Sequence, residues 1–422
     1  MALGFGRAPT SAAEEPPRRA IVLSGGGARG AYEAGVLSYV FEELPARLGF
    51  MPRLDVYAGT SVGAVHCCFL AAHADELSEG VRALAGLWRR MSFSTVYRFG
   101  VGDAFNFSRT LVGSLLGRSV HAEEHPDRIH GLLNTTPLEQ LVVRQIPWRR
   151  LRRNLRSKVL DSLCVSTTEI ATGRTVTFID NREREVGAWT GDPMVVARSA
   201  RIGPDHALAS AAIPVLFPAV KVRGTYFCDG SLRQYSPLSP ALRLRCNRIL
   251  SIGLRRAVPR EPDEKLREAR IEKFRSAGFM FGKILNTLLI DRLDHDILQM
   301  RLLNRLLLAG LDLSGPEFLA RVNRDLARER GFDLRVVQDC LIRPSEDIGM
   351  IAAEHVRSMR RSRSASWMGG MAFRVLTRGA PEGEADLMSY LLFDGEYASS
   401  LIELGRADAA RAEDELVRFF SS

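Results

Sequence analysis

Two segments near the start of the chain follow the same plan, in which a short apolar run ends in glycines and leads into apolar residues at helical spacing. The first occupies residues 20–48, with its glycines at Gly25–Gly27. The second occupies residues 54–71, with its glycines at Gly59 and Gly63. A strand, a tight turn and a helix produce this pattern. Two such units in succession predict an α/β protein with a mainly parallel sheet, whose loops gather at the carboxyl ends of the strands.

The length of 422 residues leaves room for one or two domains. We expect a flexible leader over residues 1–19, an α/β domain over 20–250, and a largely helical C-terminal region of unknown role over 251–422. Within the last region, Lys265–Gly310 has the apolar stripe of a long helix, and Leu334–Ile342 has the pattern of one further strand. The long helix either packs on the sheet or lies at a membrane interface.

The balance of charges favours anionic partners. Lys and Arg number 58 against 49 Asp and Glu, which gives a formal net charge of +9. A nucleic acid or the headgroups of acidic lipids would suit this charge. Because the basic residues are not interleaved with aromatic residues in a known nucleic-acid motif, we expect no nucleic-acid partner. The arginine-rich segments Arg144–Lys158 and Arg357–Arg363 are either solvated faces or a surface that draws the protein to anionic membranes.

The cysteines and the N-terminal residues indicate a reducing compartment. The six cysteines show no C-x-x-C spacing, so we expect buried free thiols. The first twenty residues combine charges and prolines without an apolar core, and we expect no signal peptide. Residues 56–74 lack formal charge, but their polar side chains argue against a membrane span. We therefore expect a cytoplasmic protein, with peripheral membrane binding left open.

The residues Gly59-Thr60-Ser61-Val62-Gly63 fit the pattern G-x-S-x-G between a predicted strand and a predicted helix. A nucleophile elbow requires this position, because flanking glycines allow the sharp turn that exposes the serine hydroxyl. A glycine-rich turn with an incidental serine is the alternative. The strand-turn-helix context favours a nucleophilic Ser61.

A second glycine-rich loop, Gly25-Gly26-Gly27-Ala28-Arg29-Gly30, also follows a predicted strand and opens a helix. One interpretation is dinucleotide binding, in which an acidic residue after the second strand holds the ribose. The other is an oxyanion hole, in which glycine N–H groups face the negative oxygen of a tetrahedral intermediate. The second strand leads into Gly59 and Ser61 instead of an acidic residue, which favours the oxyanion hole.

A serine nucleophile needs a base, and Asp229 stands at the end of a strand-like run. A carboxylate there accepts the serine proton directly when a dry pocket raises its pKa. His66 is a rival base, but it lies five residues beyond Ser61 on the predicted helix, and we expect it to point away.

A metal site is weakly indicated by His121-Ala122-Glu123-Glu124-His125, which matches H-x-x-E-H. Pro126 follows directly and opposes the helix that would bring both histidines to one face. We therefore predict a polar loop, no metal and no cofactor.

These motifs form an ordered set that resembles the patatin-like phospholipase family. The set comprises Gly25-Gly26-Gly27-x-Arg29-Gly30, Gly59-Thr60-Ser61-Val62-Gly63, Ala209-Ser210-Ala211-Ala212-Ile213-Pro214 with Phe217-Pro218, and Asp229-Gly230. The resemblance covers about residues 20–250, and the joint pattern is far more specific than any one part. It implies a three-layer α/β/α fold and hydrolysis of lipid acyl esters by a Ser–Asp dyad.

The resemblance also implies a role for individual residues. These are Ser61 as nucleophile, Asp229 as general base, Gly25, Gly26 and Gly27 as the oxyanion loop, Arg29 and Gly30 as its support, and Gly59 and Gly63 as the glycines of the elbow. Two positions depart from the family pattern, since Ser231 stands where Gly or Ala is usual and Val62 where Ala is commoner. Both departures concern the reaction rate and the pocket width more than the dyad.

The sequence thus leads us to expect a serine acyl hydrolase that acts on a phospholipid or lysophospholipid. Two alternatives from other classes stay open. The first is a nucleotide-binding oxidoreductase that uses the loop Gly25–Gly30 for its cofactor. The second is a catalytically silent lipid-binding or interaction module with the same fold. The residues indicate no particular oligomeric state.

Overall fold

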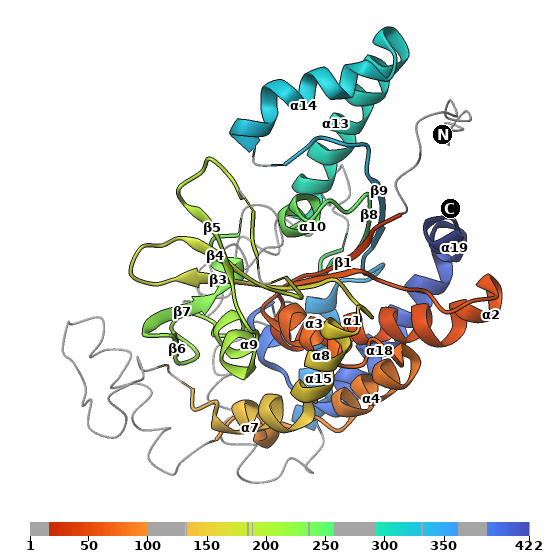
Figure 1. Ribbon diagram of the computed structural model, residues 1–422. Coiled ribbons are helices and arrows are strands. Elements are labelled where there is room, and N and C mark those ends of the chain that lie inside the picture. Colours follow the sequence, from red (N-terminus) through yellow and green to blue (C-terminus); the bar gives the residue numbers. More distant parts are fainter. Residues whose placement is uncertain are drawn as a thin grey trace, which may run out of the picture.

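A computed structural model of the chain describes residues 17–98, 131, 133–183, 185–187, 189–234, 237–256, 293–330, 332–361 and 386–421. A twisted central sheet lies between two layers of helices (Figure 1). The predicted α/β/α class is therefore confirmed. The proposed leader up to residue 16, the segment His121–His125 and the first part of the predicted long helix, 265–292, lie outside the described residues.

The sheet has nine strands within the described residues, in the order β5-β4-β3-β2-β1-β8-β9, with β7 attached to β3 and β6 attached to β7. Their bounds are β1 Arg19–Leu23, β2 Val56–Thr60, β3 Ser162–Glu169, β4 Thr175–Asn181, β5 Val195–Ser199, β6 Val220–Val222, β7 Thr225–Asp229, β8 Arg248–Ile252 and β9 Gln338–Ile342. The pairs β3–β2, β2–β1, β1–β8 and β8–β9 are parallel. Strands β3 and β4 form an antiparallel hairpin.

The helices and short helical turns are η1 Gly27–Arg29, α1 Gly30–Ser38, η2 Tyr39–Glu43, α2 Leu44–Leu48, α3 Val62–Ala72, α4 Leu77–Arg89, α5 Phe93–Val96, α7 Thr136–Gln145, α8 Trp148–Arg156, α9 Pro204–Ser210, η3 Gly230–Leu232, α10 Ser239–Arg243, α13 Leu293–Ser314, α14 Glu317–Arg330, α15 Ile348–Arg361, α17 Asp386–Leu391, α18 Gly395–Arg411 and α19 Glu413–Ser421. Helices α1, α3, α4, α8 and α18 lie on one side of the sheet, and α10 and α13 on the other (Figure 1).

The alternation of side chains along β1 builds two separate cores. Ile21 and Leu23 join the larger core with α1, α3, α4 and α18. Ala20 and Val22 join a smaller core with Leu293 and other residues of α10 and α13. Successive side chains of a strand point to opposite faces, so a strand covered on both sides must be apolar throughout. This explains why β1 reads as a continuous apolar run.

Residues beyond 250 contribute to both faces of the sheet. Strand β9 extends the sheet beside β8, where the sequence predicts a strand. Helix α18 packs on α1 so closely that a Cβ at Gly35 would collide with the backbone of Ile402. Helix α13 buries Leu293 and Ile297 against the sheet. Leu302, Leu306 and Leu313 on the same helix are exposed, so α13 packs on the sheet through only part of its apolar surface.

Two further expectations concern the cysteines and the membrane-spanning potential of the helices. All six cysteines are buried free thiols, as predicted. In the ranges that the structure describes, none of the helices combines the length and the hydrophobicity needed to cross a bilayer.

Candidate active site

Ser61 occupies a sharp turn between β2 and α3. Its backbone angles, φ of 54° and ψ of −129°, lie in a region that residues other than glycine rarely adopt. Such backbone strain is concentrated at functional sites. A Cβ at Gly59 would collide with the backbone of Gly63, and one at Gly63 would collide with the Leu23 carbonyl. The two glycines therefore permit the tight packing of an elbow that presents Ser61 at the carboxyl end of β2.

A buried serine holds the backbone of this elbow. The Ser61 N–H donates to Ser210 Oγ at 2.9 Å, and Ser210 Oγ donates to the Ser166 carbonyl at 2.6 Å. Ser210 is fully buried at the end of α9. No function was expected for Ser210 from the sequence, although it lies within the motif Ala209–Pro214.

Asp229 lies at the end of β7, which pairs with β3 beside the elbow. The residue is fully buried, and its Oδ1 accepts a hydrogen bond from the Ser231 N–H at 2.8 Å. Its Oδ2 is buried without a well-formed hydrogen bond from any described residue. Burial raises the pKa of Asp229 to about 6, while contacts with the side chains of Ser61 and Ser231 and with the Ser231 amide lower it by less. The fold thus brings Ser61 and Asp229 together from distant parts of the sequence.

The glycine-rich loop passes directly over these two residues. A Cβ at Gly25 would lie 2.9 Å from the Cβ of Ser61 and would collide with Ser231 Oγ. Gly27 has a φ of +54°, and a Cβ there would collide with the Tyr390 carbonyl. Gly26 precedes the turn η1, and its Cβ would collide with Leu254. Glycine is therefore required at Gly25 and Gly27 for steric reasons, whereas the contact at Gly26 is with the end of a flexible side chain. The loop backbone lies near the Ser61 side chain.

Arg29 and Gly30 support the loop from behind. Arg29 is 7% exposed, its Nε donates to Ser389 Oγ at 2.8 Å, and its guanidinium lies 4.1 Å from the centre of the Tyr390 ring. A Cβ at Gly30 would collide with Val62. No pattern in the sequence indicates the two C-terminal partners of Arg29.

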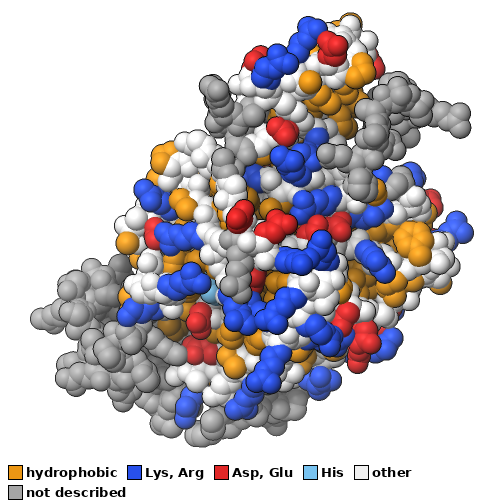
Figure 2. All heavy atoms as spheres, in the orientation of Figure 1, with side chains coloured by type: hydrophobic (Ala, Val, Ile, Leu, Met, Phe, Trp, Pro, Cys, Tyr) orange, Lys and Arg blue, Asp and Glu red, His pale blue; other side chains and the backbone are white. Residues whose placement is uncertain are grey.

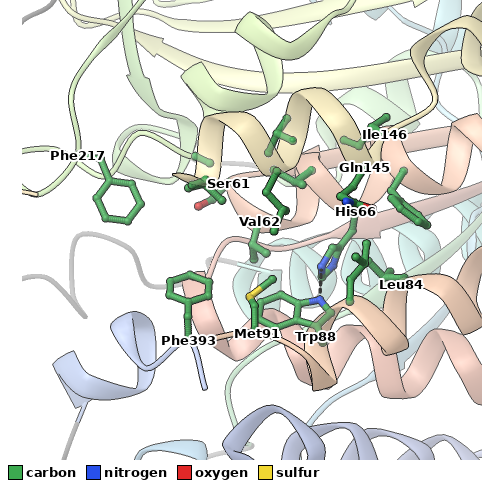
Figure 3. A pocket seen from close by; sticks show the side chains of 18 of the residues that line it. Ser61, Val62, His66, Leu84, Trp88, Met91, Gln145, Ile146, Phe217 and Phe393 are labelled. Atoms are coloured by element: carbon green, nitrogen blue, oxygen red, sulfur yellow. Dashed lines mark hydrogen bonds between the residues drawn. The ribbon is translucent and has the colours of Figure 1, made fainter. Parts of the chain in front are cut away.

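A narrow cavity of about 70 Å³ opens beside Ser61 and Gly27. Phe217 and Phe393 lie near the Ser61 end, and Leu84 and Ile146 lie at the other end (Figure 3). Met91, which follows α4, and further apolar residues of α3, α4 and α7 complete the walls. The helical residues include Val62, Val65, Phe69, Leu87, Trp88, Leu138, Leu141 and Val142. A site with these walls suits a hydrocarbon chain better than a polar ligand.

His66 lies in the pocket wall and is bound on both ring nitrogens. Its Nδ1 lies 2.7 Å from Glu33 Oε2, and its Nε2 accepts a hydrogen bond from Trp88 Nε1 at 3.0 Å (Figure 3). Glu33 is fully buried and also accepts from the Ser24 N–H at 3.0 Å. The sequence did not indicate this network, in which His66 faces Glu33 and Trp88.

The arginine-rich segment Arg144–Lys158 is partly neutralised. Arg150 pairs with Asp75 at 2.8 Å and with Glu76 at 2.5 Å, Arg153 pairs with Asp75, and Arg152 pairs with Asp180. The side chains of Arg144, Arg149, Arg156 and Lys158 are exposed. Figure 2 shows Lys and Arg side chains spread over this face of the molecule, with Asp and Glu side chains between them.

Metal ligands do not cluster in the part of the chain that the structure describes, where no group of three or more His, Cys, Asp or Glu side chains could hold an ion. The segment His121–His125, for which we predicted a polar loop, lies outside that part.

Comparison with known proteins gives one strong match. The model of a family described as patatin-like phospholipase matches residues 21–242, whereas no curated protein matches the sequence. Among solved structures, VipD from Legionella pneumophila has a TM-score of 0.29 and 12% identity, covering 92% of this chain and 67% of that chain. The ExoU–SpcU complex of the type III secretion system of Pseudomonas aeruginosa has a TM-score of 0.23 and 17% identity, covering 94% of this chain and 75% of that chain.

The family match spans more than half of the 422 residues. It includes the glycine-rich loop, the Ser61 elbow and Asp229. This chain therefore belongs to the patatin-like phospholipase family.

Proposed function

We propose that the protein is a serine acyl hydrolase that cleaves carboxylic esters of glycerophospholipids or lysophospholipids. The main support for this proposal is that Ser61, on its strained turn, lies next to the buried carboxylate of Asp229. A serine hydroxyl is a weak nucleophile until an adjacent base takes its proton. Asp229 has the position and the raised pKa of such a base.

The reaction proceeds in two steps. Asp229 accepts the Ser61 proton while Ser61 Oγ attacks the ester carbonyl, and the oxyanion forms beside the amides of Gly25–Gly27. The tetrahedral intermediate collapses to an acyl-serine as Asp229 returns the proton to the departing alcohol. Water then attacks the acyl-serine in the same way and releases the fatty acid. Each amide of the oxyanion loop contributes about 3 kcal/mol to transition-state stabilisation.

The shape and lining of the cavity support a lipid acyl chain as the substrate group. Nearly all of its walls are apolar, and the nitrogens of His66 in the wall are already bound to Glu33 and Trp88. Burial of apolar surface gives about 0.8 kcal/mol for each methylene group, so an acyl chain binds there with substantial affinity. We propose that the ester carbonyl lies beside Ser61 and that the chain extends toward Leu84 and Ile146.

A fluorophosphonate probe and p-nitrophenyl butyrate test this proposal together. We expect the probe to label Ser61 in the wild type, as read by mass spectrometry of the labelled peptide. Ser61→Ala and Asp229→Asn should retain the fold and lose ester hydrolysis, whereas Ser400→Ala, an exposed serine of α18, should keep full activity. Full activity in purified Ser61→Ala or Asp229→Asn would contradict the dyad. A folded wild type that resists the probe would favour a silent module, and tight NAD or FAD binding would favour an oxidoreductase.

We also propose that the protein binds anionic membranes peripherally. Arg144, Arg149 and Arg156 are exposed on α7 and α8, and α7 provides part of the pocket wall. Basic residues near a membrane surface contribute about 1 kcal/mol each to binding of acidic lipids. Docking through this face would bring the pocket close to its substrate.

A further inference from the structure

The segment 387–393, which lies beyond the residues that the family model matches, contacts the glycine-rich loop. The Tyr390 carbonyl occupies the space into which a side chain at Gly27 would project. Ser389 is fully buried and accepts a hydrogen bond from Arg29 Nε at 2.8 Å, and the Tyr390 ring stacks on the Arg29 guanidinium. The segment therefore touches the loop through backbone and side chains.

The same segment supplies a wall of the cavity through Phe393. This side chain is 6% exposed and stacks on Trp88, with ring centres 5.9 Å apart and an interplanar angle of 11°. It also meets Tyr97 edge-on at 5.9 Å, and Tyr97 meets Phe217 edge-on at 6.0 Å. These four aromatic side chains form one cluster, and Figure 3 shows Phe393 and Phe217 near Ser61.

The position of the segment is fixed from its C-terminal side. Asp394 caps α18 by accepting hydrogen bonds from the N–H groups of Glu396 and Tyr397 at 3.0 and 3.1 Å. His355 Nε2 lies 2.9 Å from the same carboxylate. Leu391 and Leu392 are fully buried in the larger core. A segment held in this way is rigid enough to position what it touches.

We propose that residues 387–393 complete the active site. Ser389 and Tyr390 are positioning residues that hold the oxyanion loop through Arg29, and Phe393 is a wall residue that sets the preference for acyl-chain length. This inference rests on the proposed function, because it assigns the segment to that same site. Oxyanion stabilisation depends on donors placed to within a fraction of an ångström. A loosened loop should therefore lower kcat more than it changes KM.

The first test removes the contacts to Arg29. We expect Ser389→Ala and Tyr390→Leu to lower kcat for p-nitrophenyl butyrate about tenfold with KM changed less than about twofold. A displaced donor stabilises the transition state less but leaves the binding of the substrate nearly unchanged. Ser389→Thr and Tyr390→Phe, which keep the hydroxyl and the ring, should retain most of kcat. If Ser389→Ala does not fold, Ser389→Cys provides a milder loss of the acceptor. Ser400→Ala is the control for C-terminal substitution.

A double-mutant cycle shows whether Ser389 acts through Arg29. We expect Ser389→Ala to have little further effect on kcat in an Arg29→Met background, because the two residues share one contact. Fully additive losses would mean that Ser389 acts elsewhere, and would overturn the positioning role.

The second test concerns chain length. We expect Phe393→Leu to raise the ratio of kcat/KM for p-nitrophenyl dodecanoate over butyrate about fivefold, because a cavity of about 70 Å³ confines a long chain more than a short one and a smaller side chain enlarges it. Leu387→Ala, in the same segment but outside the pocket lining, is the matched control and should keep the wild-type ratio.

The outcomes separate this inference from the proposed function. A folded wild-type chain without esterase activity or probe labelling overturns the proposed function, and this inference with it. A different set of results overturns this inference alone. In that case the wild type is active and needs Ser61, the folded Ser389 and Tyr390 variants keep the wild-type kcat, and Phe393→Leu keeps the wild-type chain-length ratio.

Discussion

His66 Nδ1 lies 2.7 Å from Glu33 Oε2, and both side chains are buried, with His66 in the wall of the pocket. Since Trp88 donates to His66 Nε2, the proton of the neutral imidazole resides on Nδ1 and is donated to Glu33. Glu33 also accepts from the backbone of Ser24, directly before the glycine-rich loop. One buried carboxylate thus links the loop to the pocket wall.

The first prediction is that Glu33→Ala destabilises the protein more than Glu33→Gln. The alanine variant leaves the N–H groups of His66 and Ser24 buried without their acceptor, and each costs about 1–3 kcal/mol. Glutamine retains one acceptor oxygen and should lose less. Urea unfolding at pH 7 measures both free energies. Equal stability of Glu33→Ala and wild type would show that the network contributes nothing.

The second prediction concerns the dependence of the rate on pH. We propose that the ionised form of Asp229 is the base, and burial raises its pKa to about 6, so kcat/KM should rise with pH through about 6 and then level off. Ser231→Ala removes a hydroxyl that lowers this pKa, so its profile should move to higher pH. Ser400→Ala should keep the wild-type profile. A flat profile between pH 5 and pH 8 would argue against Asp229 as the base.

The elements that the sequence predicts correctly carry local signals. Strand β1 is apolar from Ala20 to Leu23 and strand β2 from Val56 to Ala58. The turn at Ser61 is marked by Gly59 and Gly63, which are four positions apart. These patterns depend on the pleat of a buried strand and on the conformational freedom of glycine, which neighbouring residues reveal. The pairing of Ser61 with Asp229 has no local signal. The end of a strand-like run makes Asp229 a candidate base, and the resemblance to a family assigns the two residues to one dyad.

The contacts that the sequence did not reveal join residues far apart in the chain. Ser389 and Arg29 are 360 positions apart, and nothing near Ser389 marks it as a partner of the glycine-rich loop. Likewise, Asp75 and Asp180 neutralise arginines of α8 that looked like a basic face from the sequence alone. Such pairs are set by how the helices pack on the sheet, and one sequence without homologues gives no measure of this.

The third prediction concerns membranes. Replacing Arg144, Arg149 and Arg156 together by Gln should weaken binding to phosphatidylserine-containing vesicles at least tenfold, since each exposed arginine contributes about 1 kcal/mol. The charge-matched control replaces the exposed arginines Arg305, Arg321 and Arg324 of the α13–α14 hairpin (Figure 1). Vesicle flotation at low and high salt measures both. Equal losses in the two triple variants would show that net charge matters and the α7–α8 face does not.

The fourth prediction is that Asp229→Asn stabilises the protein at pH 8. The pKa of Asp229 in the folded chain, about 6, lies above its ordinary value of 3.8. The folded state therefore binds this proton more tightly than the unfolded state does, so the contribution of Asp229 to stability is greatest below pH 3.8 and falls as pH rises through about 6. A shift of this size corresponds to about 3 kcal/mol at high pH.

Asparagine carries no charge to bury, and its side-chain oxygen still accepts from the Ser231 N–H. Urea unfolding should therefore show the variant to be more stable than wild type by about 2–3 kcal/mol at pH 8, with the difference shrinking toward pH 4. Asp333→Asn, at a partly exposed carboxylate, is the control and should show no such trend. The contrary result is a difference in the free energy of unfolding between Asp229→Asn and wild type that does not depend on pH. That result would mean that Asp229 does not bear an unfavourable buried charge in the folded protein. In that case the carboxylate would also lack the raised basicity that proton transfer from Ser61 requires.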